Sequence, residues 1–247
     1  MSKNEKIAYG MHPVEELVNS GLLVKRVYFS QDKKSEKFDE LKNILQENKI
    51  PFTEKSDRFI EKLCGSPNHQ GIIAMFTPQE RELCFKNKNY TPRTGNFLCL
   101  YLDRIQDPHN FGAIVRTSEF FLVDQIFYPE HNNAPFNSVA LKASAGGGFH
   151  NPPYRISSVT NFFENVASHD FQVIGTNPTE GKDFDEIDFT QNTLLIVGNE
   201  GEGISRKTTE YCTDFIKLPS ESQIQSLNVS VFTGIILYHI YKQRIEN

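Results

Sequence analysis

Apolar residues in the second part of the chain fall into short runs of strand length. The runs are "FLCLYL" (97–102), "QIFY" (125–128), "FQVIG" (171–175), "TLLIVG" (193–198) and "FIKL" (215–218). Strands of a parallel sheet read as continuous apolar runs because helices cover both of their faces. The pattern therefore predicts an α/β fold with a mostly parallel sheet and helices on both faces.

Helical periodicity fills the segments between these runs. We expect helices over 111–121, 159–167 and 205–211, and a last helix over 228–244. The last segment has apolar residues on more than one side, which indicates a helix that is buried on more than one side. The pattern leaves open whether this helix belongs to a core or to an interface between subunits.

The first part of the chain reads as a smaller α/β module. Helical and strand patterns alternate there, over 12–21, 24–30, 38–48 and 71–76. The segment that follows is charged and contains Pro and Gly, as linkers between domains do. We therefore expect a small domain at 1–77, a linker at 78–95 and a larger domain at 96–247.

The composition bounds the class of protein. Of the 247 residues, 38% are hydrophobic and 12% are aromatic, which is enough apolar material for packed cores and excludes a disordered chain. The formal net charge of −5 excludes a polycationic coat for nucleic acid. A local basic patch remains compatible with this charge.

The sequence predicts neither a membrane span nor a secretion signal. The most apolar stretch, Val229–Tyr241, is shorter than the ~18–20 residues that a span needs. The first residues lack the apolar segment of a signal peptide. The four Cys stand far apart without a C-x-x-C pair, which favours buried, reduced thiols. We therefore expect a cytoplasmic protein.

The common constellations of metal and nucleophile sites are missing from the sequence. The seven His include no H-x-x-x-H pair, and G-x-S-x-G does not occur. We expect no metal. His109 is the one His in a candidate site loop, and we interpret it as structural.

Three polar loops each follow an apolar run, where parallel α/β folds bind their ligands. In "LDRIQDPHNFGAIVRT" (102–117), Asn110 is the expected cap of a helix and Arg116 lies further along it. The loop "IVGNEGEGIS" (196–205) is rich in Gly, which leaves backbone amides free to point at a ligand. The loop "LPSESQIQSLNVS" (218–230) leads into the apolar last helix. By themselves, the first two loops are also compatible with a capped surface helix and a tight turn.

Together the three loops resemble the motifs of the SpoU (TrmH) family of SPOUT RNA ribose methyltransferases. The first resembles N-x-G-x-x-x-R-T, through Asn110, Gly112, Arg116 and Thr117. The second resembles G-N/A-E-G-x-G over 198–203, and the third resembles P-x-x-x-x-x-x-S-L-N-V-S over 219–230. The segments "YGMHPVEELV" (9–18) and "NHQGIIA" (68–74) are similar to the family's accessory substrate-binding domain.

The resemblance implies a fold, a cofactor and an assembly. The domain at 96–247 would contain a trefoil knot, and the domain at 1–77 would bind RNA. The cofactor would be S-adenosylmethionine, with S-adenosylhomocysteine as its product. The residues expected to hold it are Gly198, Leu218, Leu227, Thr176, Asn177, Gly201 and Asn228. The enzyme would be a homodimer formed through the last helix.

The implied reaction moves a methyl group to a ribose 2′-hydroxyl. It needs the hydroxyl oxygen in line with the methyl group and the hydroxyl proton removed. The residue that matches the family's catalytic position is Arg116. A guanidinium stays protonated, so we interpret it as a clamp on a substrate phosphate and on developing negative charge. The other expected catalytic residues are Asn110, Asn228, Ser230 and Glu200.

The expected substrate is RNA, with a guanosine of large-subunit ribosomal RNA as the first hypothesis. The expected RNA contacts are Asn137, Lys142 and Ser144. The alternatives are a transfer RNA 2′-O-methyltransferase and a non-catalytic RNA-binding or ribosome-assembly factor of the same fold. A generic nucleotide-binding protein is disfavoured because the phosphate-loop lysine is missing. Leu122, Ser222 and Phe232 depart from the family's pattern.

Overall fold

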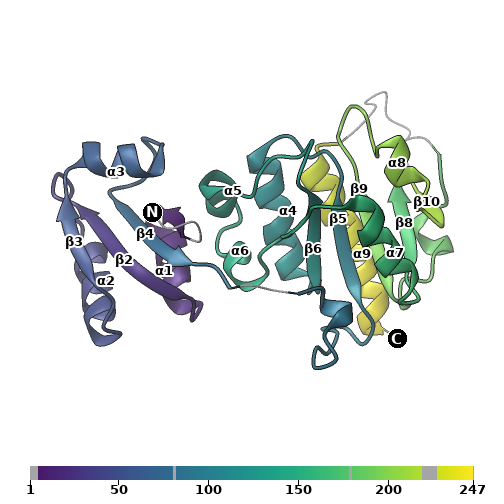
Figure 1. Ribbon diagram of the computed structural model, residues 1–247, viewed down its shortest axis with the longest axis horizontal. Helices are drawn as coiled ribbons and strands as arrows, with labels where there is room; N and C mark the ends of the chain where they lie inside the picture. Colours follow the sequence, from purple (N-terminus) through teal and green to yellow (C-terminus); the bar gives the residue numbers. More distant parts are fainter. Residues whose placement is uncertain (1–4, 80–81, 178–179, 219–226, 247) are drawn as a thin grey trace.

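The computed structural model describes residues 5–79, 82–177, 180–218 and 227–246. These residues form two α/β units, one around a four-stranded sheet and one around a six-stranded sheet. The units lie side by side along the long axis of the molecule (Figure 1). Within the described ranges, no helix is long and apolar enough to cross a membrane.

The N-terminal sheet has the strand order β1-β4-β2-β3. Its strands are β1 (Lys6–Tyr9), β2 (Leu23–Ser30), β3 (Phe52–Lys55) and β4 (Ile72–Thr77). Strand β4 pairs antiparallel with β1 and β2, and β2 pairs parallel with β3. A bulge interrupts β2 between Val24 and Arg26.

Helices cover the two faces of the N-terminal sheet unequally. The helices are α1 (Met11–Asn19), α2 (Glu36–Glu47) and α3 (Asp57–Cys64). Helices α1 and α2 bury Leu17, Leu41 and Leu45 against one face, in a core that includes Phe29 of β2. On the other face, α3 alone supplies a small core around Ile60.

The C-terminal sheet is parallel throughout, with the order β10-β8-β9-β5-β6-β7. Its strands are β5 (Leu98–Leu102), β6 (Gln125–Pro129), β7 (Tyr154–Ile156), β8 (Gln172–Thr176), β9 (Thr193–Val197) and β10 (Asp214–Ile216). Every residue of β5, β6 and β9 is buried, because the sheet is covered on both sides. The predicted parallel α/β sheet is confirmed.

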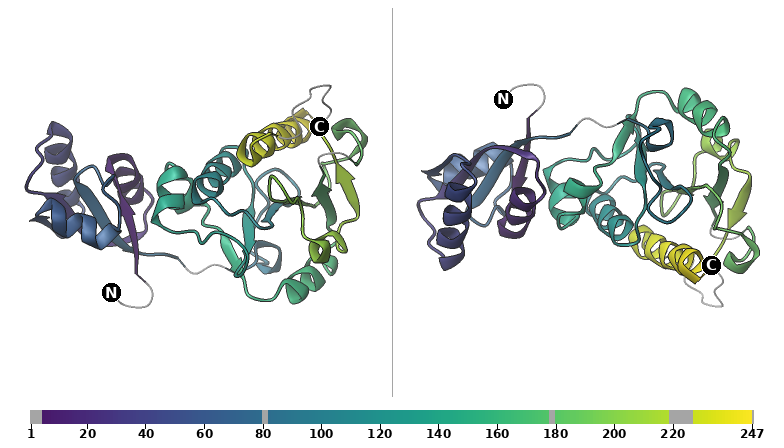
Figure 2. Two further views of the ribbon diagram at one scale, coloured as in Figure 1. Left: turned by 90° about the horizontal axis from the view of Figure 1, so that it is seen from above. Right: turned by 90° about the horizontal axis from the view of Figure 1, so that it is seen from below.

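Helices flank both faces of this sheet. They are α4 (Pro108–Phe120), α5 (Ser138–Ala143), α6 (Gly147–His150), α7 (Val159–Ala167), α8 (Arg206–Thr209) and α9 (Val229–Glu246), with short 3₁₀ turns η1 (Cys84–Lys86) and η2 (Phe184–Glu186). Helices α4, α5, α6 and α9 contribute to one core, and α7 and η1 to the other. Both views of Figure 2 show α9 lying alongside α4.

Three strands and three helices of the described chain were not predicted from the sequence. The missed strands β1, β3 and β7 have at most four residues and lie at sheet edges. Their mixed polar and apolar residues leave little periodic signal. The missed helices are α3, α5 and α6.

The segment expected to be a linker packs against the C-terminal core for much of its length. Cys84 and Phe85 are buried there, and the Tyr90 ring stacks on Phe97. The backbone N–H of Arg93 donates to Asp124 at 2.8 Å. Since these contacts are with the six-stranded sheet and its loops, the segment from Cys84 onward belongs to the C-terminal unit.

The cysteines are free thiols, in two kinds of environment. Cys84 and Cys99 are buried, with their sulfur atoms 3.7 Å apart. Cys64 and Cys212 are only half-buried, so the expectation that all four are buried is wrong for this pair.

Arg244 ties the end of α9 to the start of the C-terminal sheet. Its guanidinium donates to the carbonyl oxygens of Phe189 (2.8 Å), Gln191 (2.7 Å), Phe97 (3.1 Å) and Asn96, and to Thr94 Oγ1 (2.9 Å). Burial lowers the pKa of Arg244 to about 10, so the group remains charged at neutral pH.

Candidate active site

Three loops that are far apart in the sequence are joined by side-chain hydrogen bonds beyond the carboxyl ends of β5, β9 and β10. Asn110 Nδ2 donates to Glu200 Oε1 at 3.2 Å, and Asn228 Nδ2 donates to Asn110 Oδ1 at 3.0 Å. The same Glu200 oxygen accepts from the backbone N–H of Val229 at 2.8 Å. One residue from each of the three loops thus forms a connected cluster, which we call the Asn110–Glu200–Asn228 cluster.

The start of α4 places Asn110 in this cluster. Asp107 caps the helix, and its carboxylate accepts from the backbone N–H of His109 at 2.9 Å. Pro108 follows at the first helical position, where its fixed φ suits the helix and its missing N–H costs nothing. The expectation that Asn110 is the cap is therefore wrong. Asn110 lies inside the first turn, which frees its amide for the other loops.

Asn228 organises the start of α9. Its Oδ1 accepts from the backbone N–H groups of Ser230 (3.0 Å) and Val231 (3.4 Å), which would otherwise lack helical partners. The Ser230 hydroxyl donates to the same oxygen at 2.6 Å. Leu227 is 42% exposed. Pro219, Ser222 and Ser226 of the third motif lie outside the described residues.

The Gly-rich loop closes tightly on itself after β9. Asn199 and Gly203 exchange backbone hydrogen bonds of 3.0 and 2.9 Å, and Asn199 Oδ1 accepts from the N–H of Gly201 at 2.9 Å. A Cβ on Gly198 would lie 2.3 Å from the carbonyl carbon of Gly203. A side chain at Gly198 would therefore push this loop open.

We expect Gly198→Ala to disrupt the loop. The clash is with backbone, which cannot rotate away, so the free energy of unfolding should fall by about 1–3 kcal/mol. Binding of S-adenosylmethionine, measured by calorimetry, should weaken with it. Gly201→Ala is the matched control for folding, since its Cβ would meet nothing closer than Asn199 Oδ1 at 3.6 Å. Equal thermal stability of Gly198→Ala and the wild type would contradict the clash.

Arg104 is a site residue that the sequence analysis missed. It lies in the first loop at φ +61°, a left-handed conformation that is strained for arginine. Its guanidinium donates to Glu202 Oε2 at 2.6 Å and to the Gly203 carbonyl oxygen at 3.2 Å. Its own carbonyl oxygen accepts from Asn199 Nδ2 at 3.1 Å. Arg104 therefore clamps the Gly-rich loop in place, a role that the sequence signals only through its position beside the first motif.

We expect Arg104→Ala to weaken S-adenosylmethionine binding roughly tenfold, because charged hydrogen bonds that hold the loop are lost. Arg104→Gly should behave in the same way, although it also relieves the backbone strain. Calorimetric titration of each variant measures the effect. Arg206→Ala, in exposed α8, is the control and should bind as the wild type does. Unchanged affinity in both Arg104 variants would show that the loop needs no clamp.

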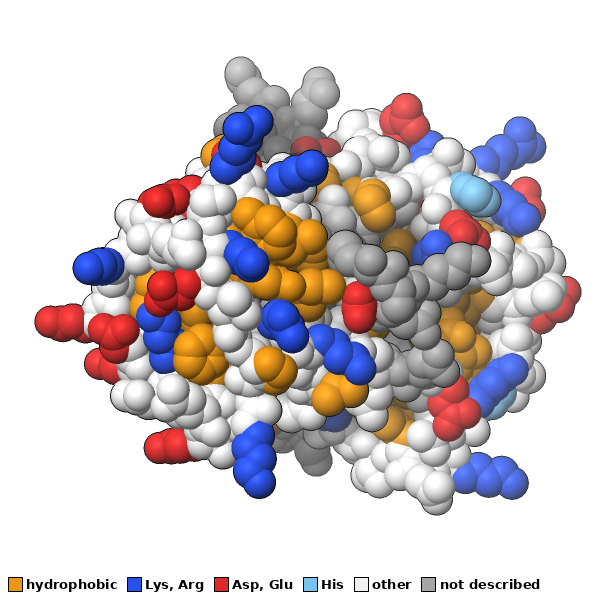
Figure 3. All heavy atoms as spheres, turned by 60° about the vertical axis from the view of Figure 1, so that its left-hand side comes forward, with side chains coloured by type: hydrophobic (Ala, Val, Ile, Leu, Met, Phe, Trp, Pro, Cys, Tyr) orange, Lys and Arg blue, Asp and Glu red, His pale blue; other side chains and the backbone are white. Residues whose placement is uncertain are grey.

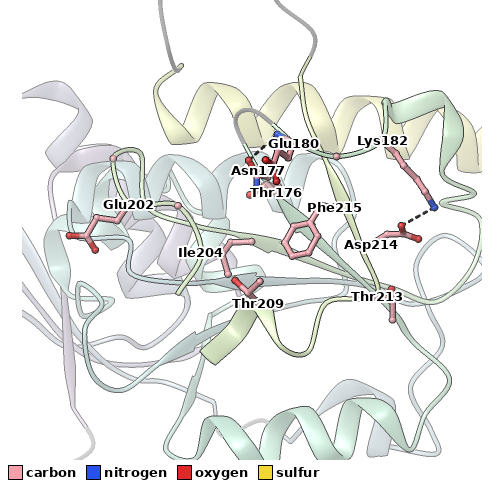
Figure 4. Close-up of a pocket in the computed structure, with 13 residues that line it drawn as sticks. Thr176, Asn177, Glu180, Lys182, Glu202, Ile204, Thr209, Thr213, Asp214 and Phe215 are labelled. Carbon is pink, nitrogen blue, oxygen red and sulfur yellow. Dashed lines mark hydrogen bonds and ion pairs between the residues drawn. The ribbon is translucent and has the colours of Figure 1, made fainter. Parts of the chain in front are cut away.

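A cavity of about 690 Å³ adjoins the Gly-rich loop. Its walls include Thr176 and Asn177 after β8, Gly201 of the loop, and the side chains of Ile204 and Phe215. Figure 4 shows Thr176, Asn177 and Glu180 grouped together, and the Lys182–Asp214 ion pair (2.8 Å) on the opposite side from Glu202. The volume and the mixed walls suit a small organic ligand with a flat apolar part and a polar part.

The described residues near this site include a thiol that is not ionised and no cluster of metal ligands. Burial raises the pKa of the Cys212 thiol to about 12, so it is not a thiolate at neutral pH. No group of three or more His, Cys, Asp or Glu in the described ranges is arranged to hold a metal ion.

Arg116 stands apart from the cluster in the single chain. It is exposed on α4, and within the described part of the chain its guanidinium has no hydrogen-bond partner. Gly112, one turn earlier, lets the backbone of α5 approach, because a Cβ there would lie 2.3 Å from the Ala140 carbonyl oxygen. The single chain therefore joins Asn110, Glu200 and Asn228 but leaves Arg116 free at the surface.

The residues expected to contact RNA lie where the two units meet. Lys142 Nζ donates to the carbonyl oxygen of Asn68 at 2.7 Å and lies 5.1 Å from the ring centre of Tyr9. Asn137 caps α5, and its Oδ1 accepts from two backbone N–H groups. Ser144 is fully buried, and its hydroxyl donates to the Leu141 carbonyl oxygen at 2.7 Å. In this structure all three side chains take part in the fold.

Two family models match the chain. The model described as "SpoU rRNA Methylase family" matches residues 98–238, and the model described as "RNA 2'-O ribose methyltransferase substrate binding" matches residues 7–82. Over 243 residues, the chain is 28% identical to a Staphylococcus saprophyticus protein whose name assigns it provisionally to the TrmH family of tRNA/rRNA methyltransferases. That alignment covers 97% of this chain and 96% of the relative.

Solved structures share the fold. The SpoU methyltransferase AviRb from Streptomyces viridochromogenes, in complex with AdoMet, has a TM-score of 0.83 at 23% identity, over 99% of this chain and 92% of that one. An AdoMet-bound rRNA methyltransferase from Sinorhizobium meliloti has a TM-score of 0.78 at 21% identity, over 97% of this chain and 87% of that one.

The fold, the interlocked loops and the matching families define an RNA methyltransferase. The chain belongs to the SpoU rRNA methylase family, whose model covers more than half of its length. The resemblance drawn from the three loop motifs is thereby confirmed.

Proposed function

We propose that this protein transfers a methyl group from S-adenosylmethionine to the 2′-hydroxyl of a ribose in RNA, with a guanosine of large-subunit ribosomal RNA as the first candidate. The observation that carries the proposal is the Asn110–Glu200–Asn228 cluster beside the 690 Å³ cavity. In such a site the chain must hold a donor in the cavity and present an acceptor oxygen next to it.

The cavity suits S-adenosylmethionine by size and chemistry. Ile204 and Phe215 offer an apolar surface for a purine ring, and Thr176, Asn177 and Glu180 offer polar groups for hydroxyls and an ammonium. Gly201 lines the same cavity, and we assign Gly198, Leu218, Leu227 and Asn228 to the adjoining wall. The bound cofactor supplies an activated methyl group on a sulfonium.

The cluster and Arg116 would have different roles at the ribose 2′-hydroxyl that accepts the methyl group. Asn110, Glu200 and Asn228 fix the three loops relative to one another, and the Ser230 hydroxyl lies within this network. Arg116 would bind a phosphate next to the target ribose and stabilise the charge that develops on the attacking oxygen. Its exposed guanidinium is available for such a contact.

We also propose the assembly that the resemblance implies. The C-terminal domain would be knotted where the third loop and α9 meet, and the N-terminal domain would bind RNA, with Asn137 and Lys142 at the junction near the substrate. The side chain of Ser144 is fully buried, so we do not propose it as an RNA contact. A second copy would cover the apolar side chains that α9 exposes, which are Val231 (52%), Ile235 (37%) and Tyr238 (57%). Phe120 of the neighbouring α4 is 77% exposed and extends this surface. The protein would act in the cytoplasm.

We expect Val231→Glu combined with Ile235→Glu to convert the dimer into monomers. Two carboxylates on this surface would be desolvated without partners in a two-fold interface, and the symmetry brings four such charges into it. Sedimentation velocity measures the shift in mass. Ile44→Glu, at a 40% exposed position on α2, should leave the mass unchanged. A wild-type protein that sediments as a monomer at all concentrations would end the dimer proposal.

Mapping of 2′-O-methyl marks tests the proposed function. Total RNA from cells with and without this gene should differ at a ribosomal RNA position, and purified protein with labelled S-adenosylmethionine should restore that mark. A mark in transfer RNA instead would identify the protein as a transfer RNA 2′-O-methyltransferase. Binding of RNA without any methyl transfer would identify a non-catalytic factor.

A further inference from the structure

One face of the N-terminal sheet is only partly covered by helix. Alternate residues of a strand point to opposite faces, so pairing register decides which side chains share a face. Opposite α1 and α2, the register aligns two rows of side chains: Tyr9, Ile73 and Tyr28, then Ile7, Met75 and Arg26. Helix α3 packs on the first row through Ile60. Of the two hydrophobic residues in the second row, Ile7 packs against the same small core and Met75 does not.

Part of the second row and its surroundings is open to solvent. Arg26 is exposed, Ile7 and Met75 are half-buried, and Leu23 at the start of β2 is 60% exposed. The bulge in β2 places Lys25 next to Arg26, and both are exposed. Figure 3 turns this unit forward and shows hydrophobic side chains gathered on its surface with Lys and Arg side chains beside them.

An aromatic pair borders this surface. The rings of Tyr28 and Phe59 have centroids 5.4 Å apart at an angle of 57°. Phe59 remains 40% exposed, and Lys55 Nζ lies 5.7 Å from the centre of its ring. A cation beside a partly open ring can meet a phosphate while the ring meets a base.

We propose that this open face, formed by Leu23, Lys25, Arg26, Met75, Tyr28, Lys55 and Phe59, binds a single-stranded segment of the RNA substrate. A base stacks on Phe59, and the phosphates lie along Lys25 and Arg26. Single strands fit this chemistry better than duplexes, because only unpaired bases present their faces to an aromatic side chain. The proposal rests on the proposed function and names the form of RNA that it requires.

The open face leads toward the C-terminal unit. A cavity of about 270 Å³ lies between the units, and Ile7 and Leu63 line it together with Phe136 and Asn137. An RNA strand that leaves the open face at Ile7 would meet this cavity and α5, which packs against α4, the helix that carries the exposed Arg116.

Fluorescence anisotropy with a labelled oligouridine of about 12 nucleotides tests the proposal. Phe59→Ala and Phe59→Leu should both weaken binding roughly tenfold, since neither residue offers a ring face. Arg26→Ala should lower the slope of log affinity against log salt by about 0.7. The matched controls are Ile44→Ala, which is also 40% exposed but lies on α2, and Lys37→Ala, which is exposed on the same helix. Both should bind as the wild type does.

The outcomes separate this inference from the proposed function. If the Phe59 and Arg26 variants bind the oligouridine with wild-type affinity and salt slope, or if a labelled RNA duplex binds equally well and all variants leave it unaffected, the face is not the RNA site. Methyl transfer by the wild type would then still support the proposed function. Failure of the wild type to bind S-adenosylmethionine or to methylate any RNA would instead remove the proposed function.

Discussion

Arg116→Lys should lower the rate of methyl transfer about a hundredfold or more while S-adenosylmethionine binding stays unchanged. A lysine keeps the charge but loses the planar fork of donors that can hold two phosphate oxygens at once. Losing a preorganised donor at a developing oxyanion costs about 10²–10³ in rate in other enzymes. Arg116 is exposed and has no hydrogen-bond partner in the described part of the chain, so its replacement should not disturb folding.

Labelled methyl transfer to an RNA transcript measures the rate, and calorimetry measures cofactor binding. Arg155→Lys is the control, because Arg155 is exposed and already paired with Glu130 at 3.0 Å. Wild-type turnover in Arg116→Lys would exclude the proposed role of the guanidinium. Equal loss in both variants would point to a general effect of surface charge.

Arg244→Ala should lower the free energy of unfolding by about 3–5 kcal/mol. Its guanidinium satisfies the carbonyl oxygens of Phe189, Gln191 and Phe97, among others. Without it the Phe189 carbonyl oxygen loses its side-chain donor, while the Phe97 and Gln191 carbonyl oxygens keep only their bonds from Thr193. Hydrogen bonds to a charged donor contribute about 1.5–3 kcal/mol each. Arg244→Lys should recover only part of the loss, since one ammonium cannot reach all of them.

Urea unfolding at a fixed protein concentration measures this loss, because dimer formation would add a concentration dependence. Lys242→Ala on the same helix is the control. Lys242 is 54% exposed and pairs only with Glu246 at 3.6 Å, so its loss should cost less than about 0.5 kcal/mol. Similar midpoints for Arg244→Ala and Lys242→Ala would contradict the anchoring role.

Five of the six strands of the C-terminal sheet could be predicted, because strands that are buried on both faces are apolar at nearly every position. β5, β6 and β9 are apolar at every position or nearly so, which is typical of strands covered on both faces. The edge strand β3, "FTEK", has no such signature, because solvent tolerates its polar residues. The pattern of apolar residues therefore identifies the buried strands of a sheet and misses short edge strands with polar residues, although it did identify the edge strand β10.

The sequence singled out the three members of the cluster but not the contacts between them. Motif spacing identified Asn110, Glu200 and Asn228, while their hydrogen bonds depend on how three loops converge in space. Asn110 was expected to cap α4 because Asn favours that position, but Asp107 followed by Pro108 is the stronger start. Arg104 was missed because its role depends on a left-handed backbone at a non-glycine residue, which composition does not reveal.

Leu122 is a second residue whose left-handed backbone could not be predicted from the sequence. Glycine is frequent in the family after the first-motif helix, and here Leu122 follows α4 at φ +59°. That conformation suits glycine. The backbone keeps it although the residue is a leucine, so Leu122 is locally strained.

The Asn110–Glu200–Asn228 cluster can form only after its last member, Asn228, has been synthesised. Its members stand 90 and 118 positions apart along the chain, and the last of them opens the final helix. A ribosome that has produced the first two has not yet released the third. If methyl transfer requires this cluster, as proposed, a growing polypeptide that has not yet reached Asn228 lacks the completed site, and so do fragments that stop before Asn228.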